Sequence, residues 1–226
     1  MLLEDLNWMD VENYLKQDDL IILVTGACEQ HGYLSLLTDI KAPMAIAVIA
    51  AQRESVLVAP PINFGVSPYF AKYPGTISLS AETFLRLIRD VIECLQAQGF
   101  KRILIVNGHG GNRIGELLIE IANAHAGLKL DWLSWWLLPE VNAIAAAHGL
   151  EPGHANWMEN FRFTRVAEVP GGVKPRVTLP AVVDASTMRI LLGDGSYGGD
   201  YQASDEVMDE LLEAVVRVVQ ARLRTL

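Results

Sequence analysis

Two apolar runs, each ending in a cluster of polar residues, constrain the fold of this chain more than any other feature. Leu20 to Val24 is a continuous aliphatic run, and Arg102 to Val106 is apolar after its first residue. Uninterrupted runs of this length, rich in Ile and Val, predict strands that are buried on both faces, as in a parallel sheet. Each run leads into a glycine and then into histidine, carboxylate or amide side chains. We therefore expect two strand ends to present polar groups at the edge of a core.

Helical patterns alternate with strand candidates along the chain. The expected strands cover residues 20–25, 56–59, 102–106 and 128–136. The expected helices cover residues 10–17 (capped by Asp10), 41–53 (with Pro43 in its first turn), 81–98, 114–126, 139–148 and 204–224, with a further helical segment at 154–163. Residues 62–76 and 193–199 read as loops, and 166–190 as an irregular excursion. This alternation predicts one domain over residues 1–226, with a mostly parallel sheet, helices on both faces and a site beyond the carboxyl ends of the strands.

Composition and charge argue against several classes of protein. Hydrophobic residues make up 51% of the 226 residues, which predicts a folded core. The net charge of −9 makes nucleic acid a poor partner, because no basic stripe is present to neutralise phosphates. No apolar run is long enough for a bilayer, and the acidic N-terminus does not resemble a signal peptide. Cys28 and Cys94 form neither a metal spacing nor a disulfide framework, so we expect a cytoplasmic protein; Cys28 reads as a small buried hydrophobe rather than a nucleophile.

Four side chains that follow the two strand candidates have the chemistry of metal ligands. Glu29, His31 and Asp39 follow the first run, and His109 follows the second. Charged groups at the edge of a core are costly unless they are paired or bind metal. Taken singly, these residues have ordinary explanations as a salt-bridge partner, a buried histidine or a helix cap. As a set they suit Zn(II), Mn(II) or Fe(II), and a shared carboxylate often bridges two ions that also share a hydroxide.

The segment after the second strand, NGHGGN at residues 107–112, has more than one interpretation. Asn-Gly and Gly-Gly are common in tight turns, and a glycine-rich loop before a helix can bind phosphate. The segment lacks the lysine of a P-loop and the order of a dinucleotide fingerprint. Its glycines would also let His109 project into a cleft and let the N–H groups of Gly110 and Gly111 approach a ligand.

Four motifs, in this order, resemble the creatininase (creatinine amidohydrolase) family. They are EQHG at 29–32, Thr38-Asp39, PGTISL at 74–79 and NGHGGN at 107–112. The resemblance implies a three-layer α/β/α fold around a mostly parallel sheet, two divalent metal ions, and hydrolysis of a C–N bond that is not an ordinary peptide. It also implies a homo-oligomer, often a hexamer. Glu29 and His109 would hold one metal, His31 would hold the other, and Asp39 would bridge them.

The second half of the chain carries a less complete match to the family motif HAGExETS. Within GHANWMENF at 153–161, His154, Ala155 and Glu159 fit the motif, whereas the residues that depart from it are Asn156, Trp157, Asn160 and Phe161. The resemblance implies that Glu159 completes the second metal site or acts as a base, and that His154 is a proton shuttle. The alternative for both residues is an exposed polar pair on a helix.

Other departures from the family bear on the substrate. Gly111 stands where creatinine-cleaving members carry a glutamate, and Phe70 or Tyr73 occupies a region where the family commonly has a histidine. These differences argue against creatinine itself. The four tryptophans Trp132, Trp135, Trp136 and Trp157 either pack in the core or stack on a flat substrate. We assign Trp132 to packing and keep Trp157 as a pocket candidate.

Together, these observations predict a metal-dependent amidohydrolase that cleaves a cyclic amide or formamide of a small molecule. A metal-bridging hydroxide would attack the carbonyl carbon, with N–H groups near Gly110 and Gly111 stabilising the oxyanion. His154 or Glu159 would pass a proton to the leaving nitrogen. Two alternatives stay open: a non-catalytic relative that binds a small ligand, with Glu159 turned away from the site, and a phosphate-binding enzyme that uses residues 107–112.

Overall fold

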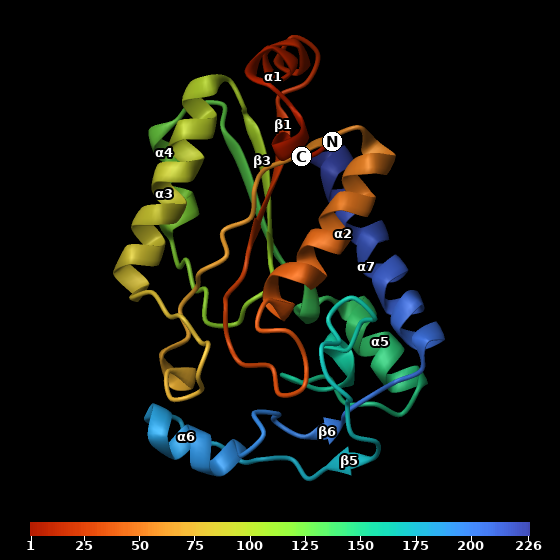
Figure 1. Cartoon of the computed structure of the whole chain (residues 1–226). Coiled ribbons are helices and arrows are strands. Elements are labelled where there is room, and N and C mark those ends of the chain that lie inside the picture. Colours follow the sequence, from red (N-terminus) through yellow and green to blue (C-terminus); the bar gives the residue numbers. More distant parts are fainter.

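A four-stranded parallel sheet forms the centre of the protein (Figure 1). The computed structural model describes all residues from 1 to 226. The strands lie in the order β2-β1-β3-β4, and their bounds are Leu57–Val58, Leu20–Thr25, Arg102–Asn107 and Lys129–Ser134, respectively. β1 and β3 are in register, with Thr25 opposite Asn107. The chain therefore leaves both central strands at the same level of the sheet.

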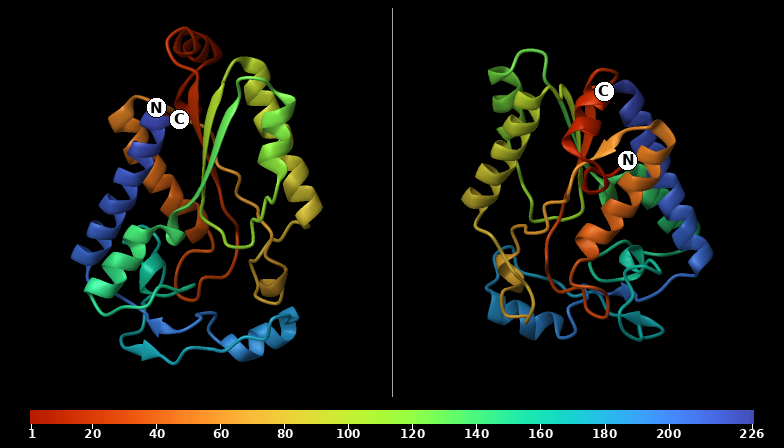
Figure 2. Two further views of the ribbon diagram at one scale, coloured as in Figure 1. Left: turned by 180° about the vertical axis from the view of Figure 1, so that it is seen from behind. Right: turned by 45° about the horizontal axis from the view of Figure 1, so that its top comes forward.

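Helices cover both faces of this sheet, which confirms the predicted three-layer α/β/α arrangement (Figures 1 and 2). One layer contains α2 (Thr38–Glu54), α5 (Pro139–Ala147) and α7 (Asp205–Thr225). The opposite layer contains α3 (Ala81–Gln98) and α4 (Leu117–Ala124), and α1 (Trp8–Leu15) lies at the end where the strands begin. None of these helices is both long and apolar enough to cross a lipid bilayer.

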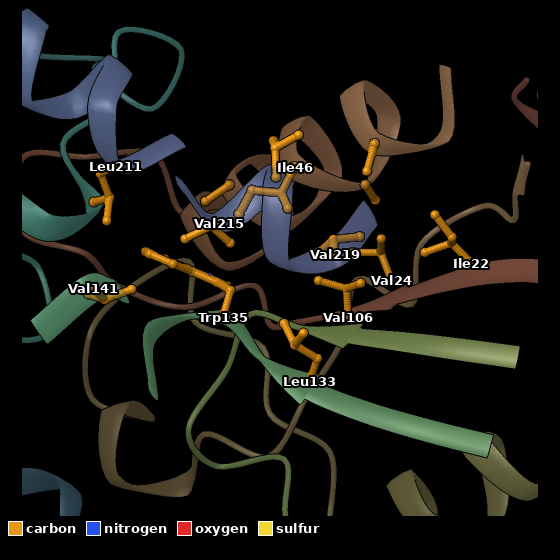
Figure 3. Close-up of a cluster of buried hydrophobic side chains, with 14 of the residues drawn as sticks. Ile22, Val24, Ile46, Val106, Leu133, Trp135, Val141, Leu211, Val215 and Val219 are labelled. Carbon is orange, nitrogen blue, oxygen red and sulfur yellow. The ribbon is translucent and has the colours of Figure 1, made fainter. Parts of the chain in front are cut away.

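Alternation along the central strands divides the core into two clusters. Ile22 and Val24 face the layer of α2 and α7, whereas Ile21 and Leu23 face the layer of α3. Figure 3 shows the first cluster, in which strand residues meet side chains of α2, α5 and α7 and the buried Trp135. Because every residue of β1 is buried, the strand has no polar face. This two-sided burial explains why its sequence is an unbroken aliphatic run.

The carboxyl ends of the strands are covered by an irregular segment that follows α5. This segment contains α6 (Ala185–Leu192) and an antiparallel pair formed by β5 (Val173–Lys174) and β6 (Gly199–Asp200). It lies across the lower end of the molecule in Figure 1. Lys174 ties it together, because its ammonium group pairs with Asp194 and donates to the carbonyl oxygens of Leu192 (2.6 Å) and Ser196 (2.8 Å).

Several expected elements differ from those observed. Helix α1 begins earlier than expected, because Asn7 and not Asp10 is its cap; Asp10 instead completes a capping box. Helix α4 is shorter than residues 114–126, because Gly115 adopts a positive φ of 49° just before it. Helix α2 begins at Thr38, so Pro43 lies in its second turn.

The second half of the chain also departs from its expected elements. Residues 154–163 contain only a 3₁₀ turn at Trp157–Glu159, because Ala155 has a positive φ of 52° and the Asn156 side chain accepts from the N–H of Met158. Helix α6 begins within the segment that was expected to be irregular and ends two residues after it, and Asp184 caps the helix. Single residues that interrupt a helix or cap its start therefore set these boundaries.

Two glycines bring the start of α2 against the ends of β1 and β3. A Cβ atom on Gly26 or Gly108 would lie 2.1 Å or 2.0 Å from the carbonyl oxygen of Asp39. In a regular helix this oxygen would accept from the N–H of residue 43, but Pro43 has none. The first turn of α2 therefore packs directly against the backbone of these two glycines. This contact places Asp39 between the two strand ends.

We predict that Gly108→Ala lowers the free energy of unfolding by about 2 kcal/mol or more, because the added methyl group overlaps a backbone atom that cannot rotate away. Urea denaturation monitored by circular dichroism measures this change. Gly171→Ala is the matched control, since nothing lies within 4 Å of its added Cβ, and it should change stability by less than about 0.5 kcal/mol. Equal stability of the two variants would contradict the close-approach explanation.

Candidate metal centre

Five acidic and imidazole side chains from distant parts of the chain meet beyond the carboxyl ends of β1 and β3. Their exposed fractions lie between 1% and 7%. Glu29 and His31 come from the loop after β1, Asp39 from the first turn of α2, His109 from the loop after β3, and Glu159 from the 3₁₀ turn at Trp157–Glu159. All five were predicted as metal ligands, and the structure brings them together.

The five side chains form two groups that share Asp39. In the first group, His109 Nδ1 lies 2.8 Å from Asp39 Oδ2 and 3.4 Å from Glu29 Oε1. In the second, His31 Nε2 lies 2.9 Å from Asp39 Oδ1 and 3.8 Å from Glu159 Oε2. Two ligand atoms that share a tetrahedral ion are about 3.4 Å apart. These groups therefore have the spacing of two adjacent ion sites with one oxygen of Asp39 directed to each.

Unsatisfied oxygen atoms mark the centre of this cluster. Glu29 Oε2 and Asp39 Oδ2 are buried and make no hydrogen bond. Asp39 Oδ2 lies 2.8 Å from His109 Nδ1 without forming a hydrogen bond to it. Buried carboxylate oxygens without partners are rare because they lose their hydration. A bound cation would satisfy both, so the donor set fits divalent metal ions.

Backbone carbonyl groups orient the two imidazole rings. His31 Nδ1 donates to the carbonyl oxygen of Glu29 (3.1 Å), and His109 Nε2 donates to that of Val66 (3.0 Å). A carbonyl oxygen can only accept, so the remaining nitrogen of each ring faces the carboxylates. This arrangement is common around metal-binding histidines, where the outer partner sets the tautomer and the ring orientation.

Without cations, protons balance the buried negative charge. Burial by itself lowers the pKa of His31, but Asp39 and Glu159 outweigh this effect and raise it to about 10. The pKa of His109 is also raised, since Glu29 and Asp39 overcome its burial. The same two imidazoles hold the pKa of Asp39 far below its usual range despite burial. Burial raises the pKa of Glu159 to about 7.

His154 lies beside the cluster as a neutral imidazole. Burial and the charge of His31 lower its pKa well below the ordinary value. The Gln30 amide has a fixed orientation: Oε1 accepts from the N–H of Gly32 (3.1 Å), and Nε2 donates to the Gly195 carbonyl oxygen (3.1 Å). Gln30 Nε2, a donor, lies 2.9 Å from His154 Nε2, so His154 carries its hydrogen on Nδ1, 3.7 Å from Glu29 Oε1. Phe70 stacks on the ring at 4.8 Å.

A cavity of about 410 Å³ opens onto the cluster. Besides ligand candidates and His154, its wall includes Tyr69, Phe70, Gly110, Trp136 and Tyr197. The structure places Gly110 in this wall, as expected for a substrate contact.

Two of the predicted substrate contacts lie elsewhere. Trp157 does not reach the cavity: it is fully buried in the core, and its Nε1 donates to the Glu151 carbonyl oxygen (2.9 Å). Trp136 occupies the wall instead. Gly111 is not part of the cavity wall. A Cβ atom on Gly111 would lie 2.0 Å from the Val66 carbonyl oxygen and 2.7 Å from Tyr69 Oη. Position 111 therefore has no room for any side chain, including the glutamate expected of creatinine-cleaving relatives.

Two asparagines that were not predicted as functional residues hold the loop that carries His109. Asn107 accepts from the N–H of His109 (3.2 Å) and donates to its carbonyl oxygen (2.9 Å). Asn112 donates to the Gly26 carbonyl oxygen (3.0 Å) and accepts from the N–H of Val66 (3.1 Å), so it joins three loops. The sequence signal for this role was their position as the first and last residues of the motif at 107–112.

Comparison with known proteins gives one family. The chain matches creatininase (creatinine amidohydrolase) over residues 4–223. Creatinine amidohydrolase of Pseudomonas putida is 30% identical over 115 residues, which are 48% of this chain and 44% of that protein. Mycofactocin precursor peptide peptidase of Mycolicibacterium smegmatis is 32% identical over 100 residues, 41% of this chain and 40% of that protein. 3-dehydro-scyllo-inosose hydrolase of Thermotoga maritima is 33% identical over 102 residues, 44% of this chain and 33% of that protein.

The matches to these curated relatives each span less than half of the relative's length. Solved structures extend the likeness to the whole fold. A creatininase with manganese has a TM-score of 0.84 and 23% identity, covering 99% of this chain and 97% of its own. A mutant creatininase complexed with creatine has the same TM-score and coverage at 24% identity. At these identities the structures show the fold alone.

The stability of the metal-free protein should depend on pH, and bound metal should remove this dependence. In the metal-free protein the raised pKa of His31 adds stability that is complete below the ordinary value of about 6.5 and is lost as the pH rises through about 10. A bound cation replaces that proton and cancels this dependence. Urea midpoints between pH 7 and pH 10, with EDTA and with Mn²⁺, measure the difference. His31→Gln should abolish this component, and an unchanged pH profile in that variant would contradict the assignment.

Proposed function

The chain belongs to the creatininase family, and from this premise we propose that it is a metal-dependent hydrolase that cleaves a non-peptide C–N bond of a small molecule. Cyclic amides and formamides are the substrate types that we favour. One observation carries the proposal: Asp39 directs separate oxygens to two buried groups of ligand atoms. Two ions bridged by a carboxylate are typical of hydrolases that activate water.

The residues present fit two divalent ions, with Zn, Mn or Fe as candidates. Glu29, Asp39 and His109 would hold one ion, and His31, Asp39 and Glu159 would hold the other. Oxygen and imidazole donors without thiolate suit these metals. When bound, such ions lower the pKa of water towards neutrality and polarise a carbonyl oxygen.

The surrounding residues support a division of roles between His154 and Glu159. His154 has its hydrogen on Nδ1, which faces the cluster, so it donates a hydrogen bond to the substrate. A proton shuttle would need to bind a second proton at His154 Nε2. The Gln30 amide group donates to that nitrogen and therefore opposes a proton there. Glu159 lines the cavity, and burial raises its pKa to about 7 in the metal-free protein. With Oε2 holding the second ion, Oε1 would be the oxygen left to carry a proton to the leaving nitrogen.

Backbone N–H groups at the loop after β3 are free to stabilise negative charge. The N–H groups of Gly110 and Gly111 donate to no protein acceptor. Gly110 lies in the cavity wall, next to His109. An N–H group held in place before the reaction stabilises an oxyanion without reorganisation, so Gly110 is the stronger candidate for this role.

Two alternatives have less support. A non-catalytic relative was expected to turn Glu159 away, but Glu159 Oε2 lies within the second ligand group. A phosphate site at residues 107–112 needs a helix directly after them, but α4 begins only at Leu117. No lysine or arginine lines the cavity. A homo-oligomer, a hexamer by family resemblance, and a cytoplasmic location stay predictions.

We predict that the purified protein binds about two equivalents of Mn²⁺ or Zn²⁺ and hydrolyses a member of a panel of cyclic amides, lactams and formamides. Glu29→Gln or His109→Ala should remove one equivalent, Glu159→Gln the other, and each should lower kcat/KM by about 100-fold or more, because even residues behind metal ligands have effects of 10–100-fold. Metal analysis and steady-state kinetics measure these changes.

His148→Gln is the control for these variants, since His148 pairs with Glu210 on the surface and should leave both readouts unchanged. A wild-type protein that binds no metal and gains no stability from Mn²⁺ or Zn²⁺ would refute the proposed function.

A further inference from the structure

The hydroxyl group of Tyr69 is a hydrogen-bond donor with no acceptor on the protein. The only group within hydrogen-bond distance of it is His109 Nε2, at 3.4 Å. This nitrogen carries a hydrogen, because it lies 3.0 Å from the Val66 carbonyl oxygen, which can only accept. Tyr69 Oη can therefore accept from His109 but cannot donate to it. Since Tyr69 lines the cavity, its O–H is available to a molecule bound there.

The position of this hydroxyl group separates it from the reacting centre. Tyr69 approaches the Nε2 corner of the His109 ring, whereas Nδ1 faces Glu29 and Asp39. A substrate carbonyl under attack would lie at the ligand groups, on the Nδ1 side. Tyr69 is thus placed to contact a different part of the substrate. Gly111 makes this possible, because any Cβ there would approach Tyr69 Oη to 2.7 Å.

The rest of the cavity wall indicates an uncharged substrate. Outside the ligand cluster it contains no carboxylate, and it contains no lysine or arginine. A charged substituent would have no partner of opposite charge and would lose hydration on entering. Trp136 provides aromatic surface, which suits a flat ring.

We infer that Tyr69 is a specificity-determining residue that selects neutral, flat substrates bearing a second hydrogen-bond acceptor, such as a ring carbonyl oxygen, apart from the carbonyl that is attacked. This inference rests on the proposed function, because it assumes that the reacting group lies at the ligand cluster. A substrate without the second acceptor leaves the phenolic hydrogen unpaired in the cavity, which disfavours binding.

Succinimide and 2-pyrrolidinone test this inference, because these neutral five-membered rings differ by one carbonyl group. Their binding to the full-length Co²⁺-loaded protein is measured by the change in visible absorption. We expect succinimide to bind about three- to tenfold more tightly than 2-pyrrolidinone, which is the range for one neutral hydrogen bond. Tyr69→Phe should abolish the preference while keeping the aromatic contact with Phe70.

Tyr73→Phe is the matched control, because the Tyr73 hydroxyl is buried without a partner and does not line the cavity. It should retain the wild-type preference. The inference is overturned if the wild type binds both rings equally or binds neither, or if Tyr69→Phe keeps the preference. Failure of the protein to take up Co²⁺ would instead refute the proposed function, so the two outcomes are distinguishable.

Discussion

The contact of Asp39 with both His31 and His109 is the interaction on which the rest of this structure depends. One oxygen of Asp39 faces each imidazole, at 2.9 Å and 2.8 Å. The contact exists only because β1 and β3 pair in register and end together, and because Gly26 and Gly108 let the first turn of α2 approach. A shift of one residue between the strands would separate the two histidines and divide the cluster.

Charge then determines what this cluster can do. Three buried carboxylates and two imidazoles cannot all keep their ordinary protonation states in a medium of low dielectric constant. Protons on His31 and His109 provide one balance, and the divalent cations that we propose for this site would provide another. The unpartnered oxygens of Glu29 and Asp39 show that protons alone leave the cluster incompletely satisfied. This competition links metal binding, pH and stability.

Elements whose defining interactions lie between residues close in the sequence were predicted well, and features that depend on residues far apart in the sequence were not. β1, β3, α3 and α7 were predicted to within one residue at each end, because the signals that define them act over a few residues. Two-sided burial marks the strands, and the Ser80 cap and Gly99 mark the ends of α3. The ends of α4 and the 3₁₀ turn at Trp157–Glu159 were not, because single residues with positive φ, Gly115 and Ala155, interrupt otherwise helical patterns. Residues that support the site, such as Gln30 beside His154 and Asn112 between three loops, act through partners far along the chain.

The sequence by itself determined the parallel sheet, the α/β class and four residues with the chemistry of metal ligands, because periodicity and local motifs encode them. The fifth, Glu159, was implied only by the resemblance to a family motif. Only the tertiary structure decided that Trp136 and not Trp157 lines the cavity, that Gly111 has no space for a side chain, and that Tyr69 has a free donor. The direction of a side chain and the space around it depend on contacts between segments distant in sequence. No local pattern records those contacts.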